Sequence, residues 1–268
     1  MEIPAYLRSG LLSLTLTSTV LAQIAIGAGA VPKRPNPLTQ LAIGAVTNGA
    51  SFTANSLSPG CIATIFGTGL ATYSAQAGSV PLPTTLGGAT VTVNGVPAPL
   101  FYASLLQIDF QIPYETPPGT ASVVVSVGSA NSAPFSASVQ AASPGIFQFG
   151  TNRAVAQNPD NSLNDSNNPV AGGSYIVAYL TGMGPMDNPV PDGATAPAAP
   201  LSSATSLFSA TIGGQPAKVF FLGLAPGYVG LVQANIVVPA LPAGSYPLVV
   251  TIDGVPSNAP LVTVSGPH

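Results

Sequence analysis

The sequence has few of the side chains that perform most enzyme chemistry. Histidine occurs once, at the last residue His268, tryptophan is absent, and charged residues make up 5% of the 268 residues. A Ser-His-Asp triad or a histidine-containing metal site needs an internal histidine, so both are excluded. A nucleic-acid partner requires clustered positive charge. The chain has only five Lys and Arg residues and a net charge of −3, which argues against such a partner.

Cysteine also occurs once, as Cys61, so the chain cannot form an internal disulfide. The thiol opens the apolar run Cys61–Phe66, and no internal histidine could act as its base. The pattern therefore favours a small buried strand residue over a reactive thiol.

The first 40 residues predict export. Arg8 precedes the apolar stretch Leu11–Ala22, and Ala28-Gly29-Ala30 offers a small-x-small cleavage site. We therefore expect a signal peptide over residues 1–30 and a linker over 31–40, with no membrane span left after cleavage. Cleavage after Val20-Leu21-Ala22 and an uncleaved anchor are the alternatives, because the uncharged stretch approaches the ~20 residues that span a bilayer.

An internal repeat is the strongest signal in the rest of the chain. The segment Asn94–Tyr102 recurs as Gly213–Phe221, and Gln107–Pro113 recurs as Gln233–Pro239. A repeat of about 100 residues has the size of a whole domain. The sequence thus predicts two copies of one fold, over residues 41–140 and 141–265.

Each copy reads as an all-β domain. Short runs rich in Val and Ile alternate with turns built from 29 Gly and 29 Pro residues, and the apolar share is 46%. Seven strands in about 100 residues indicate an immunoglobulin-like β-sandwich, although no Cys-Trp-Cys core of the antibody type is present. The expected strands are 45–47, 61–66, 89–93, 98–102, 108–112, 121–127 and 135–139, then 154–157, 175–180, 207–212, 217–221, 232–238, 246–252 and 261–264.

Asn94-Gly95 predicts a tight hairpin between the strands 89–93 and 98–102. Both central residues of a type I′ turn need positive φ, which Asn and Gly tolerate best.

A family resemblance rests on longer motifs. The segments Phe66–Ala71, Val91–Pro99 and Gln107–Pro113 of the first copy, with Tyr179–Pro185 and Gly223–Leu231 of the second, resemble the Solibacter-type C-terminal domain family of secreted bacterial proteins. The resemblance covers roughly residues 41–265 and implies secretion. Each half is also similar to the IPT/TIG class of immunoglobulin-like domains. Neither resemblance implies a catalytic residue.

The carboxylates do not form a convincing enzyme site. A glycosidase would need two acids facing one cleft. Asp109 stands where the other copy has Asn235, which favours local hydrogen bonding, and Asp253 precedes Gly254 at a turn. We predict no enzyme and assign no catalytic, cofactor-binding or metal-ligating residue. The acids of the mature chain are Asp109, Glu115, Asp160, Asp165, Asp187, Asp192 and Asp253.

Two loops offer alternatives. The segment 158–168 is rich in Asn, Asp and Ser oxygens, so a calcium site is possible in principle, but a series of Asx-turns is favoured. The loop 222–231 makes the second copy seven residues longer than the first at this point, and Tyr228 within it could serve as an exposed stacking residue. Packing of this apolar loop against the other domain is favoured. Asp187 and Asp192 are interpreted as part of a solvated connection.

The sequence therefore predicts an exported, non-enzymatic interaction or structural module at the cell envelope or outside the cell, with an extracellular protein or polysaccharide as partner. Exposed strand edges or the Pro-rich segment 185–200 would provide contacts for a protein. The alternative is a carbohydrate-binding module, which would use Tyr side chains because Trp is absent. Several of these tyrosines are expected in the cores; the candidates are Tyr73, Tyr102, Tyr114, Tyr175, Tyr179, Tyr228 and Tyr246.

Overall fold

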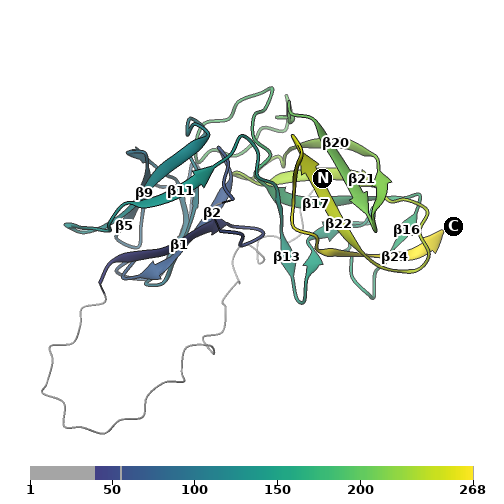
Figure 1. Ribbon diagram of the computed structural model, residues 1–268, viewed down its shortest axis with the longest axis horizontal. Coiled ribbons are helices and arrows are strands. Elements are labelled where there is room, and N and C mark those ends of the chain that lie inside the picture. Colours follow the sequence, from purple (N-terminus) through teal and green to yellow (C-terminus); the bar gives the residue numbers. More distant parts are fainter. Residues whose placement is uncertain (1–39, 55, 268) are drawn as a thin grey trace, which may run out of the picture. The chain divides into compact units, whose positions relative to one another are not determined.

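The computed structural model describes residues 40–54 and 56–267, and within these ranges the chain consists of β-strands and turns (Figure 1). The predicted signal peptide and all of the predicted linker except Gln40 lie outside the described residues. No described segment is a helix long and apolar enough to cross a membrane. From Leu41 onward the chain forms one compact unit.

The first half contains two antiparallel sheets. Its strands are β1 (Ala42–Asn48), β2 (Ile62–Thr68), β3 (Ala75–Gln76), β4 (Thr85–Leu86), β5 (Ala89–Val93), β6 (Val96–Pro97), β7 (Leu100–Ala103), β8 (Gln107–Gln111), β9 (Gly119–Val127), β10 (Ala130–Asn131) and β11 (Phe135–Val139). One sheet has the order β1-β2-β8-β7-β3. The other has the order β10-β9-β5-β4, with β11 beside β9 and β6 beside β5.

The second half repeats this plan with more short strands. They are β12 (Gly145–Ile146), β13 (Gln148–Phe149), β14 (Arg153–Ala154), β15 (Ala156–Gln157), β16 (Val170–Gly172), β17 (Tyr175–Thr181), β18 (Phe208–Ile212), β19 (Gln215–Ala217), β20 (Val219–Leu224), β21 (Val232–Val237), β22 (Gly244–Ile252), β23 (Val255–Pro256) and β24 (Leu261–Pro267). One sheet has the order β12-β17-β21-β20, with β15 beside β17. The other runs β13-β14-β24-β22-β18-β19.

Each half has its own hydrophobic core between its two sheets. In the first, Ile65 and Ile108 from one sheet join Val91 and Val125 from the other, and the buried members of this core fall between residues 46 and 139. The second core lies between residues 142 and 264. The alternation of buried and exposed residues along the strands creates these cores, and the protein is thus an all-β pair of immunoglobulin-like sandwiches. The domain boundaries 41–140 and 141–265 stay a prediction.

The Asn94-Gly95 turn forms as predicted, with φ of 51° and 84° at the two residues. The hairpin after it is shorter than expected, because β6 pairs with β5 over two residues and the chain then crosses to the other sheet as β7. Pro97 and Pro99 lack N–H groups and cannot extend a ladder. The predicted strand 98–102 is therefore wrong as the return arm of the hairpin.

Both halves carry a β-bulge at the same point of the repeat. The ladder between β7 and β8 skips Phe101, and the ladder between β20 and β21 skips Phe220. A bulge turns the extra side chain relative to its neighbours. The repeat thus extends from sequence to strand register.

Cys61 is a buried core residue, as the sequence indicated. Its side chain is fully buried and the thiol is free. Its Sγ accepts a hydrogen bond from the Ser58 N–H at 3.4 Å. Burial raises the pKa of the Cys61 thiol to about 12.

We expect the Cys61 thiol to be inert in the folded protein, because the reactive form of cysteine is the thiolate. An aromatic disulfide reagent at pH 8 should label none of the native protein and one thiol per chain in guanidinium chloride. Rapid labelling of the native protein would contradict the buried assignment.

Candidate functional site

The first candidate site is the junction, defined here by the hydrogen bonds that join the two halves. Thr181, at the end of β17, accepts a hydrogen bond from the Ile62 N–H at 2.9 Å and donates one to the Gly230 carbonyl at 2.9 Å. Ile62 belongs to the first half, whereas Gly230 lies in the loop 222–231 of the second. All three residues are buried. One hydroxyl thus satisfies backbone groups from both halves.

The Pro-rich segment 185–200 also contributes to the junction. The Gly193 N–H donates to Gln111 Oε1 at 2.7 Å, and the Tyr114 N–H donates to Asp192 Oδ1 at 2.9 Å. Gln111 is fully buried. The interpretation of Asp192 as part of a solvated connection is therefore wrong, because its carboxylate accepts a backbone hydrogen bond from the first half.

Glycines allow the halves to approach closely. A Cβ atom on Gly230 would lie 3.0 Å from the Gly60 carbonyl oxygen, and one on Gly145 would lie 2.3 Å from Asn48 Oδ1. The Asn48 amide donates to the Ser143 carbonyl at 3.1 Å. A side chain at Gly230 would crowd the Gly60 backbone, and one at Gly145 would displace the Asn48 side chain.

The loop 222–231 packs against the first half, the arrangement favoured by the sequence. Its residues Leu224, Val229 and Leu231 are buried. Tyr228 is half-buried, and its carbonyl accepts a hydrogen bond from the Ala196 N–H at 2.9 Å. This bond fixes the Tyr228 backbone, and the stacking role suggested for its side chain stays a prediction.

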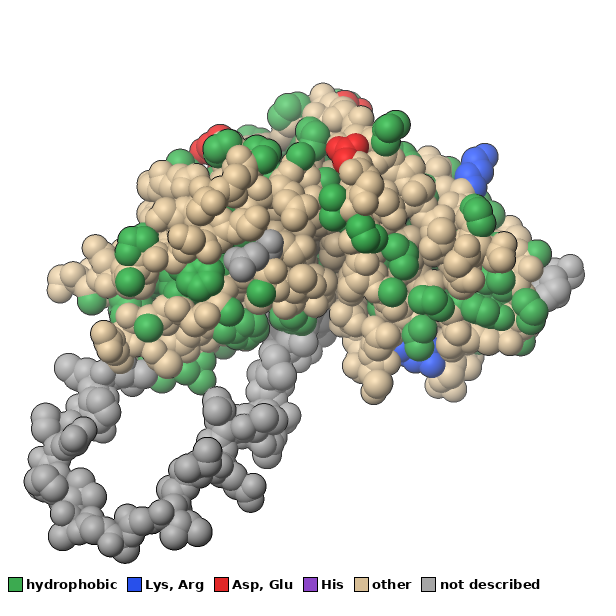
Figure 2. All heavy atoms as spheres, viewed as in Figure 1, with side chains coloured by type: hydrophobic (Ala, Val, Ile, Leu, Met, Phe, Trp, Pro, Cys, Tyr) green, Lys and Arg blue, Asp and Glu red, His purple; other side chains and the backbone are tan. Residues whose placement is uncertain are grey.

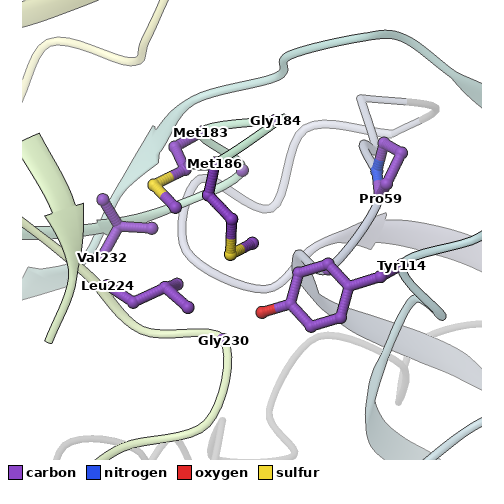
Figure 3. Close-up of a pocket in the computed structure, with 10 residues that line it drawn as sticks. Pro59, Tyr114, Met183, Gly184, Met186, Leu224, Gly230 and Val232 are labelled. Carbon is purple, nitrogen blue, oxygen red and sulfur yellow. The ribbon is translucent and has the colours of Figure 1, made fainter. Parts of the chain in front are cut away.

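A small cavity of about 10 Å³ lies at the junction. The Tyr114 hydroxyl points toward Met186 and Leu224, which help to line it (Figure 3). This hydroxyl is buried without a hydrogen-bond partner. Burial and then the Asp192 carboxylate raise the pKa of Tyr114, and the nearby Gln111 side chain opposes the rise without reaching hydrogen-bond geometry. A cavity of this size holds one water molecule at most.

Asp109 bonds locally, as its replacement by Asn235 in the second copy suggested. Its Oδ1 accepts hydrogen bonds from Thr64 Oγ1 at 2.7 Å and Gln107 Nε2 at 3.0 Å. Burial raises the pKa of the Asp109 carboxyl, and the two hydrogen bonds oppose the rise. The Asp109 carboxylate is thus held by side chains of its own half.

Two other acids cap nearby backbone. Asp253 lies at the expected turn with φ of 48°, and its carboxylate accepts a hydrogen bond from the Leu207 N–H at 3.1 Å. The Asp187 carboxylate accepts one from the Ser203 N–H at 2.7 Å.

The segment 158–168 forms the Asx-turns that the sequence favoured. Asp160 Oδ1 accepts hydrogen bonds from the Ser162 N–H and hydroxyl, which lower the pKa of Asp160. Asp165 Oδ1 accepts from the N–H groups of Asn167 and Asn168 at 2.7 and 2.8 Å. Within the described part of the chain, no three His, Cys, Asp or Glu residues are placed to hold a metal ion.

The second candidate site is the outer face of the sheet β12-β17-β21-β20. Ile176 and Ala234 point into the second core, so their strand neighbours point outward. Val177 and Tyr179 on this side are buried, and we call the more exposed residues Tyr175, Phe220, Phe221, Asn235 and Val237 the aromatic face. Tyr175 and Phe220 pack edge to face, with ring centroids 6.0 Å apart and planes at 81°.

The aromatic face contains an amide oxygen without a partner. Asn235 Oδ1 is buried and has no hydrogen-bond partner. In the first copy Thr64 pairs opposite Asp109 and bonds it, whereas in the second copy Val177 pairs opposite Asn235. The loss of the Thr hydroxyl removes one donor from this position.

The aromatic face is open where the same surface of the first half is closed. By strand register, Ile62 and Gln111 correspond to Tyr175 and Val237. Ile62 and Gln111 are buried at the junction, whereas Tyr175 and Val237 are half-buried. The second copy thus exposes the surface through which the first copy contacts its neighbour.

The candidate tyrosines differ in burial. Among the seven candidates, Tyr179 is buried, whereas Tyr102, Tyr175 and Tyr246 are half-buried. Tyr73 is 63% exposed. The sequence could not separate these cases, because the cover over the outer faces comes from distant segments.

Comparison with known proteins gives no family assignment. No protein-family model and no curated protein matches the chain. Solved structures that it resembles include the Bacteroides ovatus surface glycan-binding protein SGBP-B in complex with a mixed-linkage heptasaccharide, at 18% identity and TM-score 0.32, covering 86% of this chain and 46% of that one. The Prevotella bryantii protein PbSGBP-B matches at 14% identity and TM-score 0.28, covering 83% and 42%. Domains 5–6 of the S-layer protein SbsC match at 12% identity and TM-score 0.25, and the match covers 87% of this chain and 100% of that one.

The chain spans less than half the length of the two glycan-binding proteins. At such identities and TM-scores, these likenesses carry no argument about ligand or activity.

Replacing Thr181 by Val should loosen the junction, because the Ile62 N–H and the Gly230 carbonyl both lose a buried partner. We expect the free energy of unfolding to fall by about 1–3 kcal/mol in urea denaturation. Thr211→Val, at a half-buried residue of β18, is the control and should change stability by less than about 0.5 kcal/mol. Equal effects of the two substitutions would contradict the role of Thr181.

The junction should weaken as pH rises through the mildly acidic range. Burial and then the nearby Glu115 raise the pKa of the Asp192 carboxyl, although the hydrogen bond from Tyr114 opposes this. A carboxyl whose pKa is raised on folding stabilises the protein at low pH and loses that contribution as pH rises through the folded pKa.

Asp192→Asn keeps an acceptor for the Tyr114 N–H and removes the ionisation. We expect the melting temperature of this variant to fall less between pH 4 and pH 7 than that of the wild type, whereas the control Asp187→Asn should follow the wild type. The same fall in the Asp192 variant would refute the assignment.

Proposed function

We propose that the chain is an exported, non-catalytic binding module in which two immunoglobulin-like sandwiches act as one unit at the cell envelope or outside the cell. Its partner is an extracellular protein or polysaccharide. The observation that carries this proposal is apolar surface left exposed on a chain with few charges.

The exposed apolar side chains include neighbouring pairs. Leu105 and Leu106 are 49% and 56% exposed, and Leu207 and Phe208 are 85% and 38% exposed. Single exposed apolar residues are ordinary, whereas adjacent ones form larger patches that favour binding. Figure 2 shows hydrophobic side chains spread over one face, with few charged ones.

Two observations support a binding role over a catalytic one. The cavity at the junction is too small for a substrate. Five of the acids accept hydrogen bonds from nearby groups, as expected of acids that stabilise turns and strands. They are Asp109, Asp160, Asp165, Asp187 and Asp253.

A polysaccharide ligand is the second candidate, and the aromatic face favours it. Half-exposed aromatic rings beside an amide offer both apolar contact and hydrogen bonds. A protein partner is favoured instead by the Leu105–Leu106 and Leu207–Phe208 pairs.

Export and family membership belong to the same proposal. The signal pattern of residues 1–30 and the resemblance to the Solibacter-type C-terminal domain family both support secretion. The IPT/TIG resemblance of each half is compatible with a role in extracellular recognition.

The test uses purified full-length protein in affinity electrophoresis against bacterial and plant polysaccharides, and in cosedimentation with envelopes of the producing cell. We expect saturable binding to at least one of these, unchanged by chelator because the 158–168 oxygens are engaged in turns. Released reducing ends after long incubation, or no binding to either material, would overturn the proposal.

A further inference from the structure

We propose that the aromatic face of the second sandwich is a binding site for a neutral polysaccharide. This inference rests on the proposed function and specifies its ligand and site. The site consists of the residues that define the aromatic face: Tyr175, Phe220, Phe221, Asn235 and Val237.

The aromatic rings provide the apolar part of the site. The β-bulge between β20 and β21 leaves Phe220 52% exposed, and Tyr175 supports its ring from the neighbouring side in an edge-to-face contact. Aromatic pairs of this geometry attract each other beyond their area burial, which holds both rings in place. A sugar ring presents C–H groups on its faces that fit against such rings.

Asn235 provides the polar part of the site. Its Oδ1 has no donor within the protein, and an unpaired buried acceptor costs stability. Rotation of the terminal amide, a soft torsion, would offer the oxygen to a ligand hydroxyl. Hydroxyls are the hydrogen-bonding groups that a neutral polysaccharide has in abundance. The unpaired amide thus fits a hydroxylated ligand better than a purely apolar one.

The face is open at its edge and around Phe220. A Cβ atom on Gly173, at the edge of the face beside β17, would meet no atom within 4 Å. At the corresponding Gly60 in the first half, a Cβ would meet the Tyr114 ring at 1.9 Å. The same corner of the fold is thus filled in one copy and open in the other.

The charge of the face selects among polysaccharides. Tyr175 is the one ionisable residue among the five. The charged residue closest to the face in sequence is Lys218, two positions before Phe220. An acidic polysaccharide is normally bound through several cationic groups, and the face has no such cluster. We therefore infer that the ligand is uncharged.

The test measures binding of the full-length protein to hydroxyethylcellulose, a soluble neutral β-glucan, and to polygalacturonate, an acidic polysaccharide, by affinity electrophoresis. We expect the neutral polymer alone to retard the protein. Phe220→Ala and Asn235→Val should each weaken this binding at least tenfold. Tyr73→Ala, at an aromatic residue 63% exposed on the first sandwich, is the matched control and should bind as the wild type does.

The Asn235→Val variant separates binding from folding. Because it removes an unpaired buried oxygen, its melting temperature should equal or exceed that of the wild type while binding falls. A variant that both binds weakly and melts earlier would instead indicate a structural role for Asn235 and overturn its assignment to the ligand.

The remaining outcomes are decisive as well. Absence of binding to the neutral polymer, preference for polygalacturonate, or binding that Phe220→Ala leaves unchanged would each overturn the inference. Cosedimentation with envelopes in the same preparation would then leave the broader binding role standing, so failure of the site is distinguishable from failure of the proposed function.

Discussion

The Thr181 hydroxyl is the contact on which the joint arrangement of the two sandwiches depends. It accepts from a backbone N–H of the first half and donates to a carbonyl of the second half. Buried backbone groups need partners, and the Thr181 hydroxyl provides one for each of these two. Gln111 and Gly193 add a second link of the same kind. These hydrogen bonds explain how a chain with few charged residues can hold two domains in one arrangement relative to each other.

The junction also explains how the two copies diverged. Ile62 is buried in the contact between the halves, and the nearby Asp109 carboxylate is satisfied within its own sheet by Thr64. The equivalent surface of the second copy has no such neighbour. There Tyr175 and the Asn235 side chain, whose Oδ1 is unpaired, occupy the positions of Ile62 and Asp109, and the exposed Phe220 lies beside them, a combination that a purely structural surface would not favour.

The scarcity of charge has a structural consequence throughout the fold. Turns and loops are held by neutral or single-carboxylate hydrogen bonds, as at Asp165 and at Asn94, whose Oδ1 accepts from the Ser122 N–H at 2.8 Å. Asp192 is the exception, because Glu115 lies near enough to raise its pKa. Electrostatic change with pH should therefore act mainly at Asp192 in the junction and at the buried Asp109.

The sequence by itself determined the strands and turns that depend on local patterns. The expected strands 89–93 and 135–139 coincide with β5 and β11, and Asn94-Gly95 forms the expected turn. Such features follow from side-chain alternation and from the φ preferences of single residues.

Only the tertiary structure decided the junction and the aromatic face. The Ile62–Thr181 bond joins residues 119 apart, and no local pattern announces a partner at that distance. Likewise Ile62 and Tyr175 occupy equivalent strand positions, yet one is buried and the other half-exposed. Exposure depends on whether a distant segment covers the residue, and that is a property of the folded chain.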